Sequence, residues 1–332
     1  MKEASSISGR VLDRRSTASD VIEGIDLSEK RAIITGGASG IGIETARAFA
    51  QAGAEVTLAV RNVAEGERVA ASLNDDAGKA LVRAQALDLS DLGSVRAFAD
   101  GWRDDPLNFL VNNAGVMACP LSRTKDGFET QIGVNHLGHF LLSVLLVPAL
   151  SRGAPSRLVA LSSSAHVNSP MNFDDPHFRV REYQPFAAYA QSKTANDLFA
   201  LEFDRRYRDQ GIRAFSVMPG VISETNLIRH MTPDLVQASG LQAPSTPSDD
   251  ARGPIFYKNL QQGAATTIWA AVSRELDGQG GLYLHDCQVA QAFSPALPRG
   301  HGVHDHARDP VIARTLWSWS EREVGLPVSH ED

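Results

Sequence analysis

The strongest constraint on the fold is the stretch TGGASGIG at Thr35–Gly42, which separates an apolar run from a helical pattern. The run RAII from Arg31 is typical of a buried parallel strand, and the following IETARAFAQAG has apolar residues at helical spacing. Gly36, Gly40 and Gly42 allow the backbone to turn tightly and to approach a pyrophosphate at the helix N-terminus. A glycine-rich turn in this context predicts a dinucleotide-binding unit, whereas a plain turn is the weaker alternative.

Short apolar strands continue to alternate with helices along the chain, ending with the possible strand GGLYLHD. This alternation predicts an α/β fold, a single Rossmann-type doubly wound domain with a mainly parallel sheet and helices on both faces. We expect an N-terminal arm at residues 1–28, the Rossmann domain at 29–294, and a loop with a short helix at 295–332. Within the domain, the insert 166–188 and the loop 229–262 are expected to form the substrate side.

Composition excludes several classes of protein. The formal net charge of −7 and the pI near 5.8 argue against a general nucleic-acid binder. Two cysteines are too few for a disulfide framework, and the polar residues 1–28 contain no signal-peptide-like apolar region. The most apolar run, FLLSVLLVPAL at Phe140–Leu150, is too short to span a bilayer and indicates a buried helix. We therefore expect a cytoplasmic protein that acts on a small molecule, without nucleic acid or membrane.

The end of the second expected strand, LAVRN, indicates which dinucleotide binds. Val60 occupies the place where an acidic residue would bind the ribose 2′-hydroxyl of NAD, and Arg61 follows it. A cation there suits a 2′-phosphate, so we predict NADP (NADPH) rather than NAD; the alternative is that Arg61 only faces solvent. Asp88, after the strand RAQAL, is expected to meet the adenine edge or, alternatively, to cap a turn.

Tyr189 and Lys193, in the segment AAYAQSKTAN, are four residues apart and share one face if the segment is helical. A phenol with a pKa near 10 is a weak base at neutral pH, and a nearby ammonium favours the phenolate. The pair is therefore a candidate general acid/base, although the same spacing also occurs in ordinary exposed helices.

Four motifs together resemble those of the short-chain dehydrogenase/reductases, and the resemblance covers roughly residues 16 to 290. They are TGGASGIG, NNAG at Asn112–Gly115, LSSS, and YAQSK at Tyr189–Lys193. The stretch following NNAG is similar to the branch containing retinol dehydrogenases and WW-domain oxidoreductases. The resemblance implies an oxidoreductase that interconverts a ketone or aldehyde and its alcohol by hydride transfer.

The resemblance also assigns roles to individual residues. Tyr189 would be the general acid/base, Lys193 would also hold the nicotinamide ribose, Ser163 rather than Ser162 or Ser164 would polarise the substrate oxygen, and Asn135 would support a water-linked proton path. Asn112 is expected to brace the sheet, and Ser223 and Thr225 compete for the nicotinamide amide. The expected cofactor-binding residues are Gly36, Ser39, Gly40, Ile41, Gly42, Arg61, Asp88, Leu89, Asn113, Ala114, Gly115, Tyr189, Lys193, Pro219, Gly220 and Val221.

The aromatic insert 166–188 predicts a lipophilic or aromatic substrate, unless the insert only packs over the sheet edge. The resemblance implies a homodimer or homotetramer formed through the helices that hold Phe140 and Tyr189. Two alternatives remain: an NADPH-dependent double-bond reductase, and a cofactor-binding adaptor without turnover. Three histidines lie close together in the C-terminal region: His301, His304 and His306. Their spacing fits no standard zinc site, so we expect a solvated loop and no metal.

Overall fold

An eight-stranded sheet lies at the centre of this computed structural model, which describes residues 6–7, 10–222, 224, 226–229, 231, 236 and 255–328. All neighbouring strands are parallel except the last pair, β11 and β12. The predicted fold class, including the final strand, is confirmed. The strand order is β12 (Gln288–Val289), β11 (Leu282–His285), β8 (Ile212–Met218), β7 (Ser156–Leu161), β6 (Phe109–Asn112), β3 (Arg31–Thr35), β4 (Glu55–Val60) and β5 (Val82–Ala86).

The order in which strands are added to the sheet reverses at β3. From this strand β4 and β5 extend the sheet to one side, whereas β6, β7 and β8 extend it to the other. Ile33 of β3 pairs with Thr57 on one side and Leu110 on the other, and Ile33 and Ile34 are completely buried. The carboxyl ends of β3 and β6 are therefore adjacent at the point where ligands bind in doubly wound sheets.

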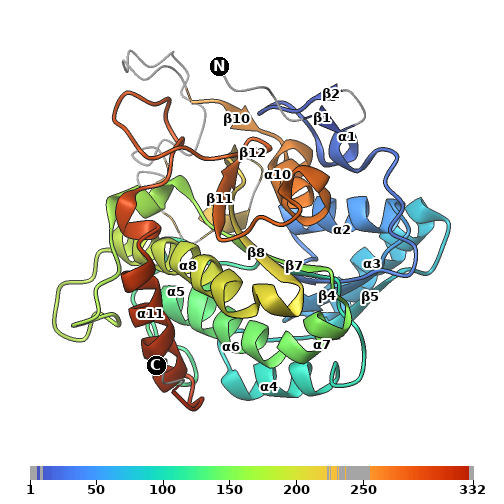
Figure 1. Ribbon diagram of the computed structural model, residues 1–332. Helices are drawn as coiled ribbons and strands as arrows, with labels where there is room; N and C mark the ends of the chain where they lie inside the picture. Colours follow the sequence, from blue (N-terminus) through green and yellow to red (C-terminus); the bar gives the residue numbers. More distant parts are fainter. Residues whose placement is uncertain are drawn as a thin grey trace.

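Helices cover both faces of the sheet because the strands are apolar on both sides (Figure 1). The first face carries α2 (Ile41–Gln51), α3 (Val63–Ala77) and α10 (Leu260–Val272), with α1 (Ala18–Ile22) of the N-terminal arm packed on α10. The second face carries α4 (Leu92–Asp100), α5 (Thr130–Ile132), η1 (Gly133–Leu137), α6 (Gly138–Leu145), α7 (Val147–Arg152), α8 (Pro185–Tyr207) and α11 (Pro310–Glu323).

The apolar run Phe140–Leu150 forms two helices rather than the single buried helix that we predicted. α6 ends at Leu145, and α7 begins at Val147 with Pro148 in its first turn. Proline lacks a backbone donor and is tolerated only in the first turn of a helix, so Pro148 forces the break.

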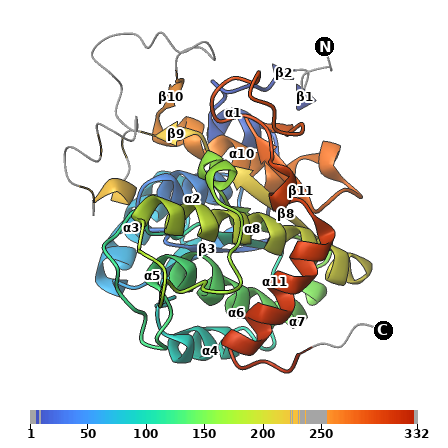
Figure 2. The same ribbon diagram turned by 90° about the vertical axis from the view of Figure 1, so that its left-hand side faces the viewer.

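The C-terminal helix α11 packs across α8 (Figure 2). The Trp317 ring packs 4.9 Å from that of Phe140 and 6.1 Å from that of Phe199, and the Arg206 guanidinium lies 4.5 Å from the centre of the Trp317 ring. The apolar side chains of α6 and α8 are thus covered by the chain's own α11. The oligomer contact expected on these helices stays a prediction.

The remaining elements are short. β1 (Ser6–Ile7) pairs with β2 (Arg10–Val11), and β9 (Val221–Ile222) pairs with β10 (Tyr257–Lys258). Most of the predicted loop 229–262 lies outside the described residues, and no helix in the described part is both long and apolar enough to cross a membrane. Single turns occur at η2 (Ser164–Asn168), η3 (Arg208–Gln210), η4 (Asn226–Ile228), η5 (Arg274–Leu276) and η6 (Asp305–Ala307).

Candidate active site

A cavity of about 720 Å³ opens at the carboxyl ends of β3, β4, β6, β7 and β8. Its size is ordinary for a cofactor site. Of the residues predicted from the sequence, Gly42 and Asn135 do not line it. Those that do are Gly36, Ser39, Gly40, Ile41, Arg61, Asp88, Leu89, Asn113, Ala114, Gly115, Ser163, Tyr189, Lys193, Pro219, Gly220 and Val221.

The glycine turn fits a pyrophosphate. Gly36 and Gly40 have φ angles of 63° and 54°, which side chains rarely adopt. A Cβ atom on Gly42 would lie 2.6 Å from the carbonyl oxygen of Gly36, so a larger residue would open the turn. The turn leads directly into α2, whose first N–H groups favour an anion.

The NNAG segment is tied to the same turn through Thr35. The backbone N–H groups of Asn113 and Ala114 donate to the Thr35 hydroxyl at 2.9 and 3.0 Å, and the Asn113 amide donates to the Thr35 carbonyl at 2.8 Å. Asn112 points the other way and donates to Ser143 on α6 at 2.8 Å, which is the bracing role that we predicted. The ends of β3 and β6 therefore form one rigid wall of the cavity.

Two arginines line the cavity. Arg61 lines it at the end of β4, and Arg229, which sequence reasoning missed, lines it after η4. The charges of both Arg61 and Cys119 act on Arg229, so this arginine lies within electrostatic range of the end of β4 and of the segment after NNAG. Asp88 accepts hydrogen bonds from the Ser90 N–H (2.9 Å) and hydroxyl (2.6 Å), so the turn interpretation of Asp88 is observed directly.

Tyr189 is 4% exposed and lies in the first half of α8. Burial raises the pKa of its phenol to about 12, and the nearby Ser163 hydroxyl only partly offsets this effect. The Lys193 Nζ lies 5.6 Å from the centre of the Tyr189 ring. The direction of this shift is opposite to the acidification that the spacing to Lys193 predicted, because burial of the phenol dominates. The phenol is protonated at neutral pH.

Lys193 is buried one helical turn further on and donates from Nζ to the carbonyl oxygen of Leu161 at 2.8 Å. Burial lowers the pKa of its ammonium to about 8, against an opposing effect from Asp197. The hydrogen bond fixes α8 to the carboxyl end of β7. Lys193 is consequently held at the floor of the cavity as a cation at neutral pH.

The structure distinguishes the three serines of LSSS. Ser163 caps η2, and its hydroxyl oxygen accepts from the Ala165 N–H at 3.2 Å, which leaves its hydrogen free to be donated. Ser162 is buried, and among the described residues its hydroxyl makes no hydrogen bond of normal geometry, although it lies near enough to Asp197 to lower the pKa of that carboxyl. Ser164 also lines the cavity, but Ser163 is the serine whose hydroxyl lowers the pKa of Tyr189.

Asn135 sits in the π-helical turn η1, a local irregularity that is frequent at functional sites. Its side-chain oxygen accepts from the Val116 N–H, and its amide donates to the Val116 carbonyl and the Ser192 hydroxyl, each at 2.9 Å. Asn135 therefore links the segment after NNAG to α8. Its role in a proton path remains a prediction.

Asp197 is a residue that sequence reasoning missed. It follows Lys193 by four residues, and burial raises the pKa of its carboxyl to about 8 against the opposing effects of Ser162, Ser216 and Lys193. Among the described residues, neither carboxyl oxygen makes a hydrogen bond of normal geometry, and His166 Nδ1 lies 3.8 Å from Oδ2. The i, i+4 spacing from Lys193 is the sequence signal that could have drawn attention to it.

The aromatic insert lies behind the wall of the cavity rather than on it. No described residue of 166–188 lines the cavity. Tyr183 donates at 2.9 Å to the carbonyl oxygen of Cys119, which does line it, and the Arg123 guanidinium donates to the carbonyl oxygen of Phe178. This placement favours the packing alternative. Both candidates for the nicotinamide amide, Ser223 and Thr225, lie outside the described residues.

Comparisons with known proteins agree with this geometry. A family profile described as short chain dehydrogenase matches residues 30–235. The chain is 43% identical over 300 residues to a Streptomyces lividans protein named "Probable oxidoreductase", covering 89% of this chain and 97% of that protein. It is 40% identical over 311 residues to human retinol dehydrogenase 11, covering 92% and 88%. The crystal structure of an uncharacterised Mycobacterium paratuberculosis protein superposes with a TM-score of 0.72 at 35% identity, covering 95% and 100%.

The chain belongs to the short-chain dehydrogenase/reductase family. It is an NAD(P)-dependent oxidoreductase, which excludes the adaptor alternative.

We predict that Asp197→Asn stabilises the protein in a pH-dependent manner. The folded carboxyl has a pKa near 8, whereas the ordinary value is 3.8. At a pH between 3.8 and about 8, the carboxyl is ionised in the unfolded chain but protonated in the folded chain. The wild type therefore loses stability as pH rises through this range. Urea unfolding at pH 5 and pH 8 measures the effect: we expect the advantage of the variant to grow by on the order of 2 kcal/mol. An equal difference at both pH values would contradict the prediction.

Proposed function

We propose that the protein is an NADPH-dependent reductase of ketones or aldehydes, catalysing the reversible interconversion with the corresponding alcohol. The observation that carries this proposal is the convergence of Tyr189, Ser163 and Lys193 on one cavity beside the glycine turn. An intact set of this kind is the minimum needed to handle the proton that accompanies hydride transfer.

The chemistry follows from the protonation states of these side chains. A reduced nicotinamide, when bound, supplies the hydride to the carbonyl carbon. The buried Tyr189 phenol, with a pKa near 12, holds the proton that the carbonyl oxygen needs. The Ser163 hydroxyl donates to the same oxygen and polarises it, and the Lys193 ammonium stabilises the phenolate that remains. A neutral phenol is in the protonation state that the acid role in reduction requires.

The residues that would hold the dinucleotide lie along the same cavity. The turn at Gly36–Gly42 and the start of α2 suit the pyrophosphate, and Lys193 is available for the nicotinamide ribose. Pro219–Val221 offers backbone groups to the nicotinamide amide, and Asp88 to the adenine edge.

NADPH is preferred to NADH on the basis of charge. Arg61 and Arg229 both line the cavity, and each guanidinium can bind a 2′-phosphate in a bidentate manner. Val60, which ends β4, cannot accept a hydrogen bond from the 2′-hydroxyl of NAD through its side chain.

A lipophilic substrate fits the apolar lining next to Tyr189. Val116, Met117, Leu227 and Ile228 all line the cavity. The name of retinol dehydrogenase 11 indicates that this relative acts on a lipophilic alcohol, which supports the same substrate class here. A double-bond reductase could reuse Tyr189 and Lys193, and parallel assays with ketones and with activated alkenes separate the two reactions.

We predict that Tyr189→Phe lowers kcat for carbonyl reduction by at least about 10²-fold, because positioned proton donors contribute about that much or more. Affinity for NADPH should change by less than about threefold, since the lost hydroxyl serves the substrate rather than the cofactor. The assay is NADPH oxidation followed by absorbance, with cofactor binding measured separately.

Tyr207→Phe, at the far end of the same helix, is the matched control and should retain normal turnover. Normal turnover in Tyr189→Phe would remove this residue from the mechanism. Loss of turnover in both variants would point to damage to α8 rather than to a lost proton donor.

We predict that Arg61→Ala raises KM for NADPH by about tenfold or more and leaves KM for NADH unchanged, because a charge-assisted hydrogen bond to phosphate is lost. Steady-state kinetics with both cofactors measure the ratio. Arg103→Ala, which removes an exposed arginine paired with Asp100, is the control and should change neither value. Equal weakening of both cofactors would contradict a 2′-phosphate role.

A further inference from the structure

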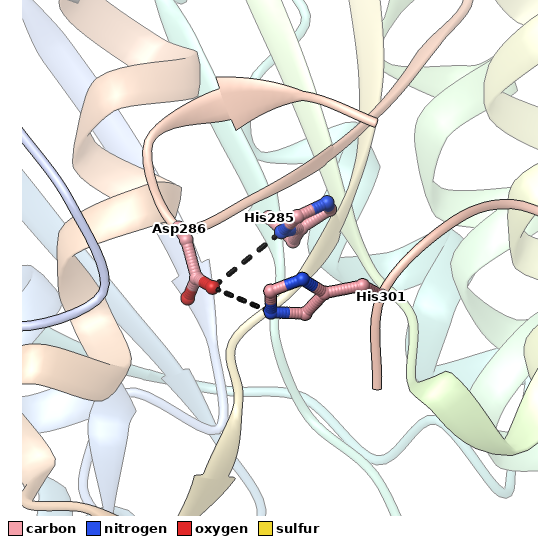
Figure 3. Close-up of side chains that lie close together, drawn as sticks. All are labelled: His285, Asp286 and His301. Carbon is pink, nitrogen blue, oxygen red and sulfur yellow. Dashed lines mark ion pairs between the residues drawn. The ribbon is translucent and has the colours of Figure 1, made fainter. Parts of the chain in front are cut away.

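A second group of chemically active side chains lies at the edge of the sheet, where β11 turns into β12 (Figure 3). His285 ends β11, Asp286 follows in the turn, and His301 approaches from the C-terminal segment. The Asp286 Oδ2 atom lies 3.2 Å from His301 Nε2 and 3.5 Å from His285 Nδ1. None of these three residues is among those that line the catalytic cavity, so the group is separate from the site described above.

The turn itself aims the carboxylate between the two rings. Asp286 and Cys287 have φ angles of 49° and 55°, the left-handed values of a two-residue hairpin turn. Such turns favour asparagine or aspartate followed by glycine, and this chain has cysteine at the second position. The backbone therefore holds Asp286 in a fixed direction although the sequence is not optimal for the turn.

The donor atoms are largely removed from water. His285 and Asp286 are buried, and the His301 side chain is 24% exposed. Among the described residues, His285 Nδ1 has no hydrogen-bond partner that meets normal geometry. The rings of His285 and His301 lie 4.6 Å apart at an angle of 30°, and one donor atom from each of the three residues lies within 4.8 Å of the other two. A buried nitrogen lone pair without a partner is costly, and a bound cation would satisfy it.

Lys258 forms an ion pair with the Asp286 carboxylate and orients it. Its Nζ lies 2.7 Å from Asp286 Oδ1, which leaves Oδ2 directed at the histidines. The ammonium also opposes a second cation. Only an ion with strong preference for nitrogen donors would overcome this repulsion, and oxygen-seeking ions such as Mg²⁺ would not.

We propose that His285, Asp286 and His301 form a binding site for a divalent transition-metal ion of the zinc class, which clamps the β11–β12 turn to the C-terminal segment. Two imidazole nitrogens and one carboxylate oxygen are an established donor set for zinc. Bonds of about 2.1 Å to a tetrahedral ion place neighbouring ligand atoms about 3.4 Å apart, close to the two separations measured here. The exposed side of His301 gives the ion an entry path and leaves a position for water.

A metal ion at this site would also affect the segment that follows Ser163 at the catalytic cavity. A Cβ atom on Gly300, next to His301, would lie 3.8 Å from the Ser164 side chain, and the His304 N–H donates to His166 Nε2 at 3.1 Å. Both contacts are with the segment that follows Ser163. The ion would thus hold the C-terminal segment against this end of the cavity without taking part in the hydride chemistry.

The test uses full-length protein without an affinity tag, treated with a chelator and dialysed. Zn²⁺ binding is followed by calorimetry and elemental analysis, and Co²⁺ binding by its visible absorption bands. We expect about one Zn²⁺ per chain, and at least about tenfold weaker binding in His301→Ala. Zn²⁺ should raise the thermal midpoint of the wild type but not that of His301→Ala.

His304→Ala is the matched control, because His304 lies in the same segment and stacks on His306 rather than on His285. It should bind Zn²⁺ as the wild type does. The proposal would be overturned if the wild type shows no saturable binding, if His301→Ala binds normally, or if His304→Ala loses binding equally. Since the readouts are metal binding and melting, this result is independent of the proposed reductase activity.

Discussion

The hydrogen bond from the Lys193 ammonium to the carbonyl oxygen of Leu161 is the interaction on which the catalytic arrangement depends. It joins the middle of α8 to the carboxyl end of β7 and thereby fixes the position of Tyr189 relative to the sheet. Because the bond is buried, it is strong, yet it also keeps a charge in a medium that disfavours charges. Burial therefore lowers the pKa of the Lys193 ammonium and raises the pKa of the Asp197 carboxyl one turn further on.

The other parts of the site are arranged around this helix. Asn135 connects α8 to the segment after NNAG, and Thr35 connects that segment to the glycine turn. These hydrogen bonds fix α8 relative to the glycine turn. They therefore also fix Tyr189 and Lys193 relative to a dinucleotide bound along that turn. α11 supports the opposite side of α8 with Trp317, so the helix is covered on both sides by the chain itself.

The sheet, its flanking helices and most of the cavity lining could be predicted from the sequence, because apolar periodicity and the glycine turn report local geometry. The features that escaped prediction depend on burial or on contacts between distant segments. The pKa of Tyr189 moved opposite to expectation because burial cannot be judged from the spacing to Lys193. Asp197 was not singled out because the sequence does not show that α8 is buried on this side, and His301 meets His285 and Asp286 only through the path of the C-terminal segment. Pro148 ended a helix that apolarity alone predicted to continue.

The most direct test of the central claim is the pH dependence of kcat/KM for NADPH-dependent reduction of a carbonyl substrate found by screening. If the buried Lys193 ammonium supports proton donation by Tyr189, activity should fall as pH rises through about 8, the pKa of that ammonium. Because Lys193 and Asp197 interact, the pKa read from this fall in activity should describe the two groups together rather than Lys193 alone. Activity that stays constant up to pH 10, near the ordinary pKa of lysine, would show that Lys193 is not held as described, and would contradict the account.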